Sequence, residues 1–296
     1  MNPSDAAAYN NLGQALAGQK KYEEAIPQYQ KQIEIKPRDQ WAYANLGRVY
    51  ILLQQYEKAI PELETAASIT PEDPAVPFNL GRAYAKTGQP EKAAKSFMRS
   101  VELQPVPFRW NAAAYEMALD NLDLDQAQKY AESAIAATVL QMQSTSLDHV
   151  TNEDVRHTAS LGAYGDTFGW IRFQQGKLSE AEKYVKSAWL LHSTGEVCDH
   201  LAQIYVKQGR KAEAIHLYEL ALATTNPMPE TRGRLASLLG SDSDIDALAE
   251  QAKPQLKEAR TIQIQELASN RRNSRVLDSL IAWAESSCSE IHHRRR

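Results

Sequence analysis

The sequence predicts an all-α protein, an α-solenoid built from repeated pairs of helices. Three independent markers recur with a period of 34 residues. An Asn-Leu-Gly triplet occupies positions 11–13, 45–47 and 79–81. The same spacing separates the prolines Pro3, Pro37, Pro71 and Pro105, and the alanines Ala25, Ala59, Ala93 and Ala127. Repeats of this length are supersecondary units that bury their apolar faces against their neighbours.

Each unit is expected to hold a first and a second helix. In the second unit, Tyr43, Leu46 and Tyr50 recur at the spacing of one apolar helical face. Gly47 and Ala59 are small enough to let the two helices cross closely, and the closing proline separates one unit from the next. Pro27 and Pro61 share a phase early in the second helix, where a missing N–H is less costly than in mid-helix. The expected solenoid covers residues 1–226, with units near 6–39, 40–73, 74–107, 108–141, 162–194 and 195–226.

Two irregularities fall in the middle of the array. In the fourth unit, the markers Trp110, Ala113 and Ala114 come one residue early relative to Ala127, which predicts one extra residue in the turn at 120–125. About 20 further residues follow, around 139–157. Thr151 with Asp154 forms a capping box that predicts a helix running to about Gln175, so longer helices are expected here instead of a loop. This region is where the weakest coupling and any hinge are expected.

Residues 227–262 are expected to form two capping helices over the open apolar end of the array. One covers 229–239 and ends at Gly240; the other covers 244–260 and is kinked or restarted at Pro254. The alternating segment 261–265 is more typical of a strand. Residues 263–296 are expected to be a divergent basic tail with a short amphipathic stretch at 276–284.

The repeat resembles the tetratricopeptide (TPR) pattern of W-x2-L-G-x2-Y, A-x3-F and a closing proline, over about residues 3–223. The resemblance implies a right-handed superhelix of about six helix-turn-helix units with C-terminal capping helices. It also implies a function as a protein–protein interaction scaffold, in which the first helices line a concave groove for a peptide or partner protein.

The inward positions of the first helices give the candidate binding residues. They are Asn11, Gln14, Asn45, Arg48, Asn79 and Arg82. In the wider family, an inward asparagine hydrogen-bonds the backbone of an extended peptide, because one amide offers both a donor and an acceptor. Arg48 and Arg82 suit an acidic side chain or a C-terminal carboxylate. The alternative is that all six are ordinary solvated residues. The five-residue clamp of chaperone-binding TPR proteins is not matched, since its basic positions fall on Asn10, Ala75 and Asn79.

Composition argues against several other classes. The net charge of -4 and the pI near 6.0 do not suit a nucleic-acid binder that relies on positive charge. No apolar run is long enough to span a bilayer, and no signal peptide is visible, so a cytoplasmic location is the default expectation. The expected partner is a protein or peptide, with acidic groups as one option, and the oligomeric state stays open.

No residue pattern supports catalysis, a metal site or a cofactor. The five histidines from His149 to His216 lack metal-binding spacing, and Cys198 is expected to pack as a small hydrophobe. Asp199 and His200 are neighbours on a helix and do not face each other. Gly162, Gly165 and Gly169 lie in a helical pattern, which indicates close helix packing and not a phosphate-binding loop. The chain is therefore not expected to be an enzyme.

A narrower resemblance occurs in the second half, in segments 125–127, 130–135, 146–149, 166–170, 181–185, 199–201 and 229–235. These segments are similar to the C-terminal TPR array of bacterial envelope-associated proteins whose N-terminal part is transglutaminase-like. The resemblance implies an alternative function, a non-catalytic accessory arm of such a protein, with an envelope or periplasmic location. Pro3 stands where a preceding unit would close, so the chain looks like the C-terminal piece of a longer protein or a stand-alone paralogue of it.

Overall fold

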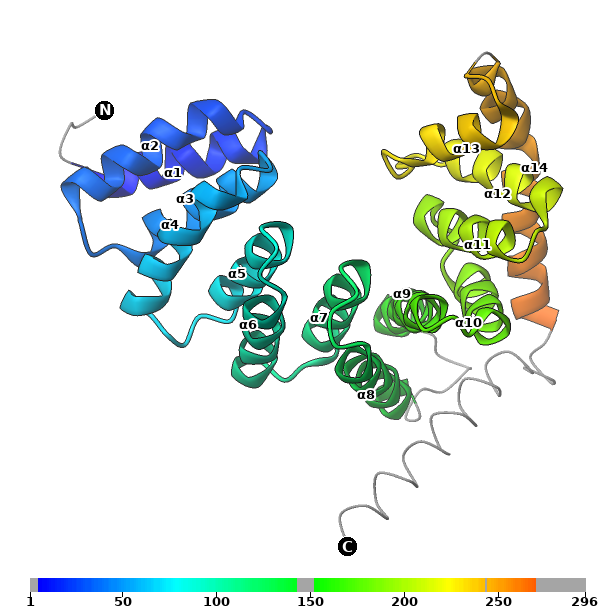
Figure 1. The fold of residues 1–296 in the computed structure, drawn as a ribbon, viewed down its shortest axis with the longest axis horizontal. Helices are drawn as coiled ribbons and strands as arrows, with labels where there is room; N and C mark the ends of the chain where they lie inside the picture. Colours follow the sequence, from blue (N-terminus) through cyan, green and yellow to red (C-terminus); the bar gives the residue numbers. More distant parts are fainter. Residues whose placement is uncertain (1–4, 143–151, 243, 270–296) are drawn as a thin grey trace, which may run out of the picture. The chain divides into compact units, whose positions relative to one another are not determined.

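The computed structural model describes residues 5–142, 152–242 and 244–269, and the side chains of these residues as far as 257. It divides into two compact units, Met1–Asp123 and Leu124–Arg296. Fourteen helices and no strand occur among the described residues (Figure 1). The division runs between the two helices of the expected fourth repeat, so each unit is described separately.

Unit 1 consists of seven helices that pack in chain order, coloured blue to green in Figure 1. Its helices are α1 (Ala6–Gly18), α2 (Tyr22–Ile35), α3 (Gln40–Leu52), α4 (Tyr56–Ile69), α5 (Ala75–Lys86), α6 (Pro90–Leu103) and α7 (Pro107–Leu119). The pairs α1/α2, α3/α4 and α5/α6 are the first three expected repeats, and α7 is the first helix of the fourth. The first helices also contact one another, α1 with α3 and α3 with α5.

Unit 2 consists of α8 (Leu124–Met142), α9 (Asn152–Gln174), α10 (Leu178–Leu191), α11 (Gly195–Lys207), α12 (Lys211–Leu222), α13 (Thr231–Leu239) and α14 (Ile245–Ser269). The pairs α9/α10 and α11/α12 are the expected fifth and sixth repeats. Helices α13 and α14 both pack against α12, as expected for caps. Ala252 and Leu256 of α14 cover Cys198, which is buried as a small hydrophobe.

The same local chemistry begins and turns successive repeats. Asp39 accepts a hydrogen bond from the Trp41 backbone N–H at the start of α3, and Asp5 caps α1 in the same way. Between the helices of a pair, one residue takes a left-handed conformation, and the next donates its N–H to a carbonyl five residues back. The left-handed residues are Lys20, Gln54, Gly88, Asn121, Gly176 and Gly209.

A close crossing joins the two helices of a repeat, as the repeat markers predicted. A Cβ atom added to Gly47 would lie 2.5 Å from Cγ of Leu63, and one added to Gly81 would lie 2.7 Å from Cε1 of Phe97. Gly169 meets Val185 in the same way, at 2.6 Å. The marker alanines of the second helices are fully buried. The helices can therefore approach only because the first one has no side chain at this point.

In the irregular middle of the chain, the described helices and turn agree with the prediction from the sequence. The turn between α7 and α8 has four residues, 120–123, whereas the turns of the other five repeats have three. Helices α8 and α9, with 19 and 23 residues, are longer than the other helices of the repeats. Thr151, the basic cluster at 271–275 and the amphipathic stretch at 276–284 lie outside the described residues.

The prediction of a strand-like segment at 261–265 is wrong. Residues 261–265 are helical, because α14 runs without interruption from Ile245 through Pro254 to Ser269. No glycine or proline follows Pro254 in this helix, and extending a helix costs less than nucleating a new element. A two-residue alternation over five positions does not outweigh that. The second cap therefore extends past the expected boundary at 262.

Pro27 and Pro61 also lie deeper than expected. Each is the sixth residue of its helix, beyond the four N–H groups that lack an intrahelical partner. Each proline therefore removes one backbone hydrogen bond, and both are exposed on the outer side of the second helix.

Gly47→Ala should destabilise unit 1 by about 1–3 kcal/mol, because the new methyl group forces Leu63 out of its rotamer or moves α3 from α4. Gly165→Ala is the matched control. Its Cβ would lie 3.8 Å from Cβ of Ala188, an ordinary contact, and alanine favours a helix by up to about 1 kcal/mol over glycine. Urea unfolding followed by circular dichroism measures both, and equal effects of the two substitutions would contradict the close-crossing argument.

Candidate peptide-binding surface

The six candidate binding residues all lie on α1, α3 and α5 of unit 1. We call the side of unit 1 formed by α1, α3, α5 and α7 the first-helix face. Asn11, Gln14 and Arg48 are exposed there, whereas Asn45, Asn79 and Arg82 are half-buried. Because the first helices pack side by side, the structure gathers the six on one surface, but it does not leave all of them equally available.

Asn45 is partly used within the fold. Its Nδ2 donates a hydrogen bond to Oδ1 of Asn10 on the neighbouring first helix, at 3.2 Å. One N–H and the carbonyl oxygen of Asn45 remain for another partner. This asparagine therefore joins two repeats and still has one donor and one acceptor.

The two arginines differ. Nε of Arg82 lies 3.1 Å from Oε1 of Glu116 on α7, one repeat further along the chain. Burial raises the pKa of Glu116, and Arg82 opposes that shift. Arg48 has no carboxylate within ion-pair distance among the described residues. Arg48 is therefore the arginine of the pair whose guanidinium is available to an anion.

An exposed stripe runs along α3. Trp41, Asn45, Arg48 and Leu52 follow each other at i, i+4, i+7 and i+11, so they share one side of the helix. Trp41 is 57% exposed and Leu52 is 45% exposed, at the two ends of the stripe. On α7 the corresponding positions hold Phe108, 53% exposed, and Leu119. Large apolar side chains exposed in this way indicate an interaction surface.

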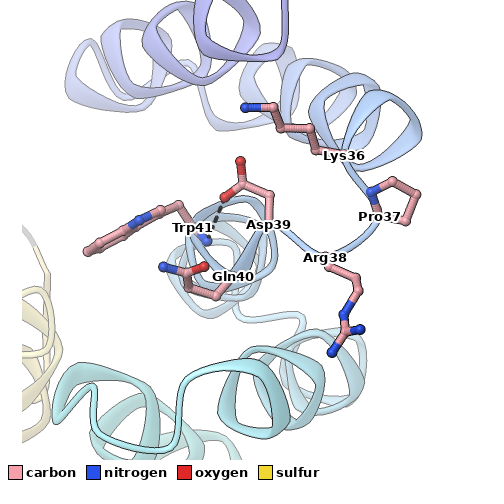
Figure 2. Close-up of a pocket in the computed structure, with 6 residues that line it drawn as sticks. All are labelled: Lys36, Pro37, Arg38, Asp39, Gln40 and Trp41. Carbon is pink, nitrogen blue, oxygen red and sulfur yellow. Dashed lines mark hydrogen bonds between the residues drawn. The ribbon is translucent and has the colours of Figure 1, made fainter.

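A shallow pocket lies beside Trp41, where α2 turns into α3. Its lining residues are Lys36, Pro37, Arg38, Asp39, Gln40 and Trp41. In Figure 2, the side chains of Lys36 and Trp41 extend to the same side of the turn, and Arg38 points away from them. The Asp39 carboxylate accepts the Trp41 N–H at 3.1 Å, so it serves the helix cap. The exposed indole thus forms one wall of a small recess next to a lysine.

Unit 2 shows the opposite arrangement at the equivalent positions of its first helices. Nδ1 of His200 on α11 lies 2.8 Å from Oδ2 of Asp166 on α9, and both side chains are buried. The next rung joins α11 to α13, where Asp199 accepts hydrogen bonds from Thr231 and Arg234, each at 2.5 Å. These contacts form a buried polar ladder that joins the alternate helices α9, α11 and α13.

The surroundings of His200 favour its charged form. Burial opposes the charge, but the Asp166 carboxylate, with smaller effects from Glu196 and Asp199, raises the pKa of His200 above its usual 6.5. The imidazole is 1% exposed and stacks on the Trp170 ring, with 4.3 Å between the ring centroids. A ring enclosed in this way holds two helices together and does not meet a substrate.

The sequence interpretation found no partner for His200, because it considered only the adjacent Asp199. The expectation that Asp199 does not face His200 was correct, because Asp199 accepts hydrogen bonds from Thr231 and Arg234. The actual partner of His200, Asp166, lies 34 residues upstream, one full repeat. The Asn10–Asn45 and Asp199–Arg234 pairs have a spacing of 35 residues. Complementary polar residues one repeat apart are the signal that identifies such contacts.

Two further findings concern the described residues alone. They contain no group of three or more His, Cys, Asp and Glu side chains placed to hold a metal ion. None of their helices has the length and apolar character needed to cross a membrane.

Family models for the tetratricopeptide repeat match residues 16–76 and 51–114, in unit 1, and residues 197–231, in unit 2. The matched segments include α3 and α5 of the first-helix face and most of the α11/α12 pair. No curated protein matches this sequence.

Solved structures share the fold at low sequence identity. A tetratricopeptide repeat protein from Parabacteroides merdae aligns with a TM-score of 0.63 and 17% identity, over 80% of this chain and 86% of that one. The type IV pilus biogenesis factor PilW aligns with a TM-score of 0.56 and 15% identity, over 78% of this chain and 98% of that one. The APC/C hetero-tetramer Cut9–Hcn1 aligns with a TM-score of 0.57 and 18% identity. That alignment covers 80% of this chain but only 44% of the other one. These likenesses concern the fold.

The Asp166–His200 pair predicts a pH dependence of stability. Because the pKa of His200 is raised in the folded state, its contribution is complete below pH 6.5 and is lost as the pH rises through the folded pKa. The Tm advantage of the wild type over His200→Gln should therefore be largest in mild acid and shrink above pH 6.5.

His216→Gln is the control for this measurement, because His216 is an exposed histidine on α12. We expect its Tm difference from the wild type to stay small from pH 5 to pH 9. A difference for His200→Gln that does not change with pH would show that folding leaves the pKa of His200 unshifted and would refute the charged pair.

Proposed function

Because the chain is a tetratricopeptide-repeat protein, we propose that it is a non-catalytic protein–protein interaction scaffold whose first-helix face in unit 1 forms the concave groove for a peptide or partner protein. The residues proposed to bind are Asn11, Gln14, Asn45, Arg48, Asn79 and Arg82. The observation that carries the proposal is the exposed guanidinium of Arg48 between two exposed apolar side chains, Trp41 and Leu52, on one helix.

The contrast between the two units supports this choice of surface. In unit 2, Asp166 and His200 of the first helices pair with each other, and Asp199 pairs with Arg234 of the cap α13. In unit 1, Asn45 pairs with Asn10, but Arg48 is exposed and has no ion pair within the described residues. Exposed aromatic and arginine side chains are the residue types that contribute most to protein interfaces.

The proposed partner carries acidic groups. Reversing the charge of both arginines, Arg48→Glu and Arg82→Glu, should therefore abolish capture of a partner from source lysate, because a carboxylate would then face two carboxylates. Arg99→Glu is the matched control, since Arg99 is exposed on the second helix α6 and pairs only with Glu102. A partner retained by the wild type and the control, but lost by the double variant, is the expected result.

The single variants complete the experiment. Arg82→Glu also removes the counter-ion of Glu116, so a loss of binding with this variant alone can reflect a disturbed α5–α7 contact. Arg48→Glu breaks no ion pair among the described residues and tests the surface directly. With the captured protein purified, we expect Arg48→Glu to raise Kd about tenfold or more at unchanged Tm. An unchanged Kd would contradict the proposed surface.

A second candidate function is the accessory arm of a transglutaminase-like bacterial envelope protein. One observation favours it: the segments that carry this resemblance include Asp166, Asp199, His200 and Arg234, the residues of the buried ladder. Residues that hold helices together suit a structural arm. A catalytic domain encoded in frame just upstream would favour this candidate over a free-standing scaffold.

A further inference from the structure

Trp41 is a large apolar side chain that the fold leaves uncovered. It is the most exposed aromatic residue among those described, and no ring or cation of the described chain packs against its indole. Phe108, at the corresponding place on α7, is different, because the Arg109 guanidinium lies 5.2 Å from its ring centroid and also contacts Phe78. The two aromatic positions are therefore not equivalent, and Trp41 is the one available to a partner.

Arg48 lies on the same side of α3, seven residues beyond Trp41. At about 1.5 Å of rise per residue, the two side chains are separated by about 10 Å along the helix axis. Its charge is not compensated by an ion pair within the described chain, in contrast to that of Arg82. Between them, Asn45 donates one N–H to Asn10 and keeps one N–H and its oxygen for a peptide backbone.

The charge around this stripe selects the ligand. Lys36 and Arg38 line the recess next to Trp41, and the one carboxylate there, Asp39, is engaged in capping α3. Arg38 points away from Trp41, so Lys36 and Arg48 are the two cations on the side of the indole, against one engaged carboxylate. An acidic ligand is therefore favoured over a basic one.

We propose that the stripe on α3 recognises an extended peptide segment of a partner protein in which a large apolar side chain and an Asp or Glu are three residues apart. A chain in the extended polyproline II conformation advances about 3.1 Å per residue with three residues per turn. Side chains three residues apart therefore lie on the same side of the peptide and about 9 Å apart, close to the separation between Trp41 and Arg48. The apolar side chain packs on the indole in the recess, and the carboxylate forms a bidentate pair with the guanidinium. This inference rests on the proposed function, since it uses the same face and specifies what that face recognises.

The test is selection of displayed random 12-residue peptides on the immobilised full chain. Enriched peptides should share a large apolar residue and an acidic residue with two residues between them. A synthetic copy should bind Trp41→Ala and Arg48→Glu about tenfold or more weakly than the wild type, as expected for interface anchors. Leu140→Ala, an exposed apolar residue on α8, and Arg99→Glu are the matched controls and should change Kd less than twofold, with all variants keeping the wild-type Tm.

The other outcomes separate this inference from the proposed function. Two outcomes would overturn the recognition rule but leave the face as a binding surface. In the first, the peptides lose affinity with Arg48→Glu but bind Trp41→Ala normally. In the second, the enriched peptides share a basic residue or a different spacing. No enrichment, or peptides whose binding none of the first-helix-face variants weakens, would overturn both.

Discussion

The close crossing of two paired helices at a glycine is the constraint on which the rest of this structure depends. At Gly47, Gly81 and Gly169 the first helix has no side chain, and the opposite helix fills that space with a leucine, phenylalanine or valine. This contact fixes the distance between the helices of a pair. It therefore also fixes which side of each first helix turns away from its partner, and so gives Asn45 on the stripe of α3 and His200 in the buried ladder of unit 2 equivalent positions.

Equivalent positions do not have equivalent uses. A polar side chain on a first helix either meets a partner on a neighbouring helix or is exposed to solvent. Asp166 meets His200 and Asp199 meets Arg234, so unit 2 uses these groups for its own cohesion. In unit 1, Asn10 meets Asn45, but Arg48 meets no carboxylate within the described chain. A buried charge without a counter-ion is costly, whereas an exposed one is not, so Arg48 can remain unpaired on the surface of unit 1.

Much of the fold follows from the sequence because its signals are local. The early position of Trp110 relative to Ala127 was enough to predict a turn one residue longer, and Gly240 marked the end of α13. The strand-like prediction for 261–265 failed because alternation over five residues competes with an already formed helix. The Asp166–His200 and Arg82–Glu116 pairs were missed because each joins residues 34 positions apart, and the sequence was searched for adjacent groups. The binding role of the six candidate residues stays a prediction.

The hydrogen bonds of Asp199 on α11 to Thr231 and Arg234 on α13 limit how such an array changes in length. Asp199 is completely buried, and its partners Thr231 and Arg234 belong to a cap and not to a repeat. A gene duplication that copied only the last repeat would insert a new first helix between Asp199 and its cap. Unless the copy supplied its own hydroxyl and guanidinium, a buried carboxylate would be left without hydrogen bonds. In unit 2, growth by duplication is therefore restricted to events that keep α11 and α13 as neighbours or that copy them together.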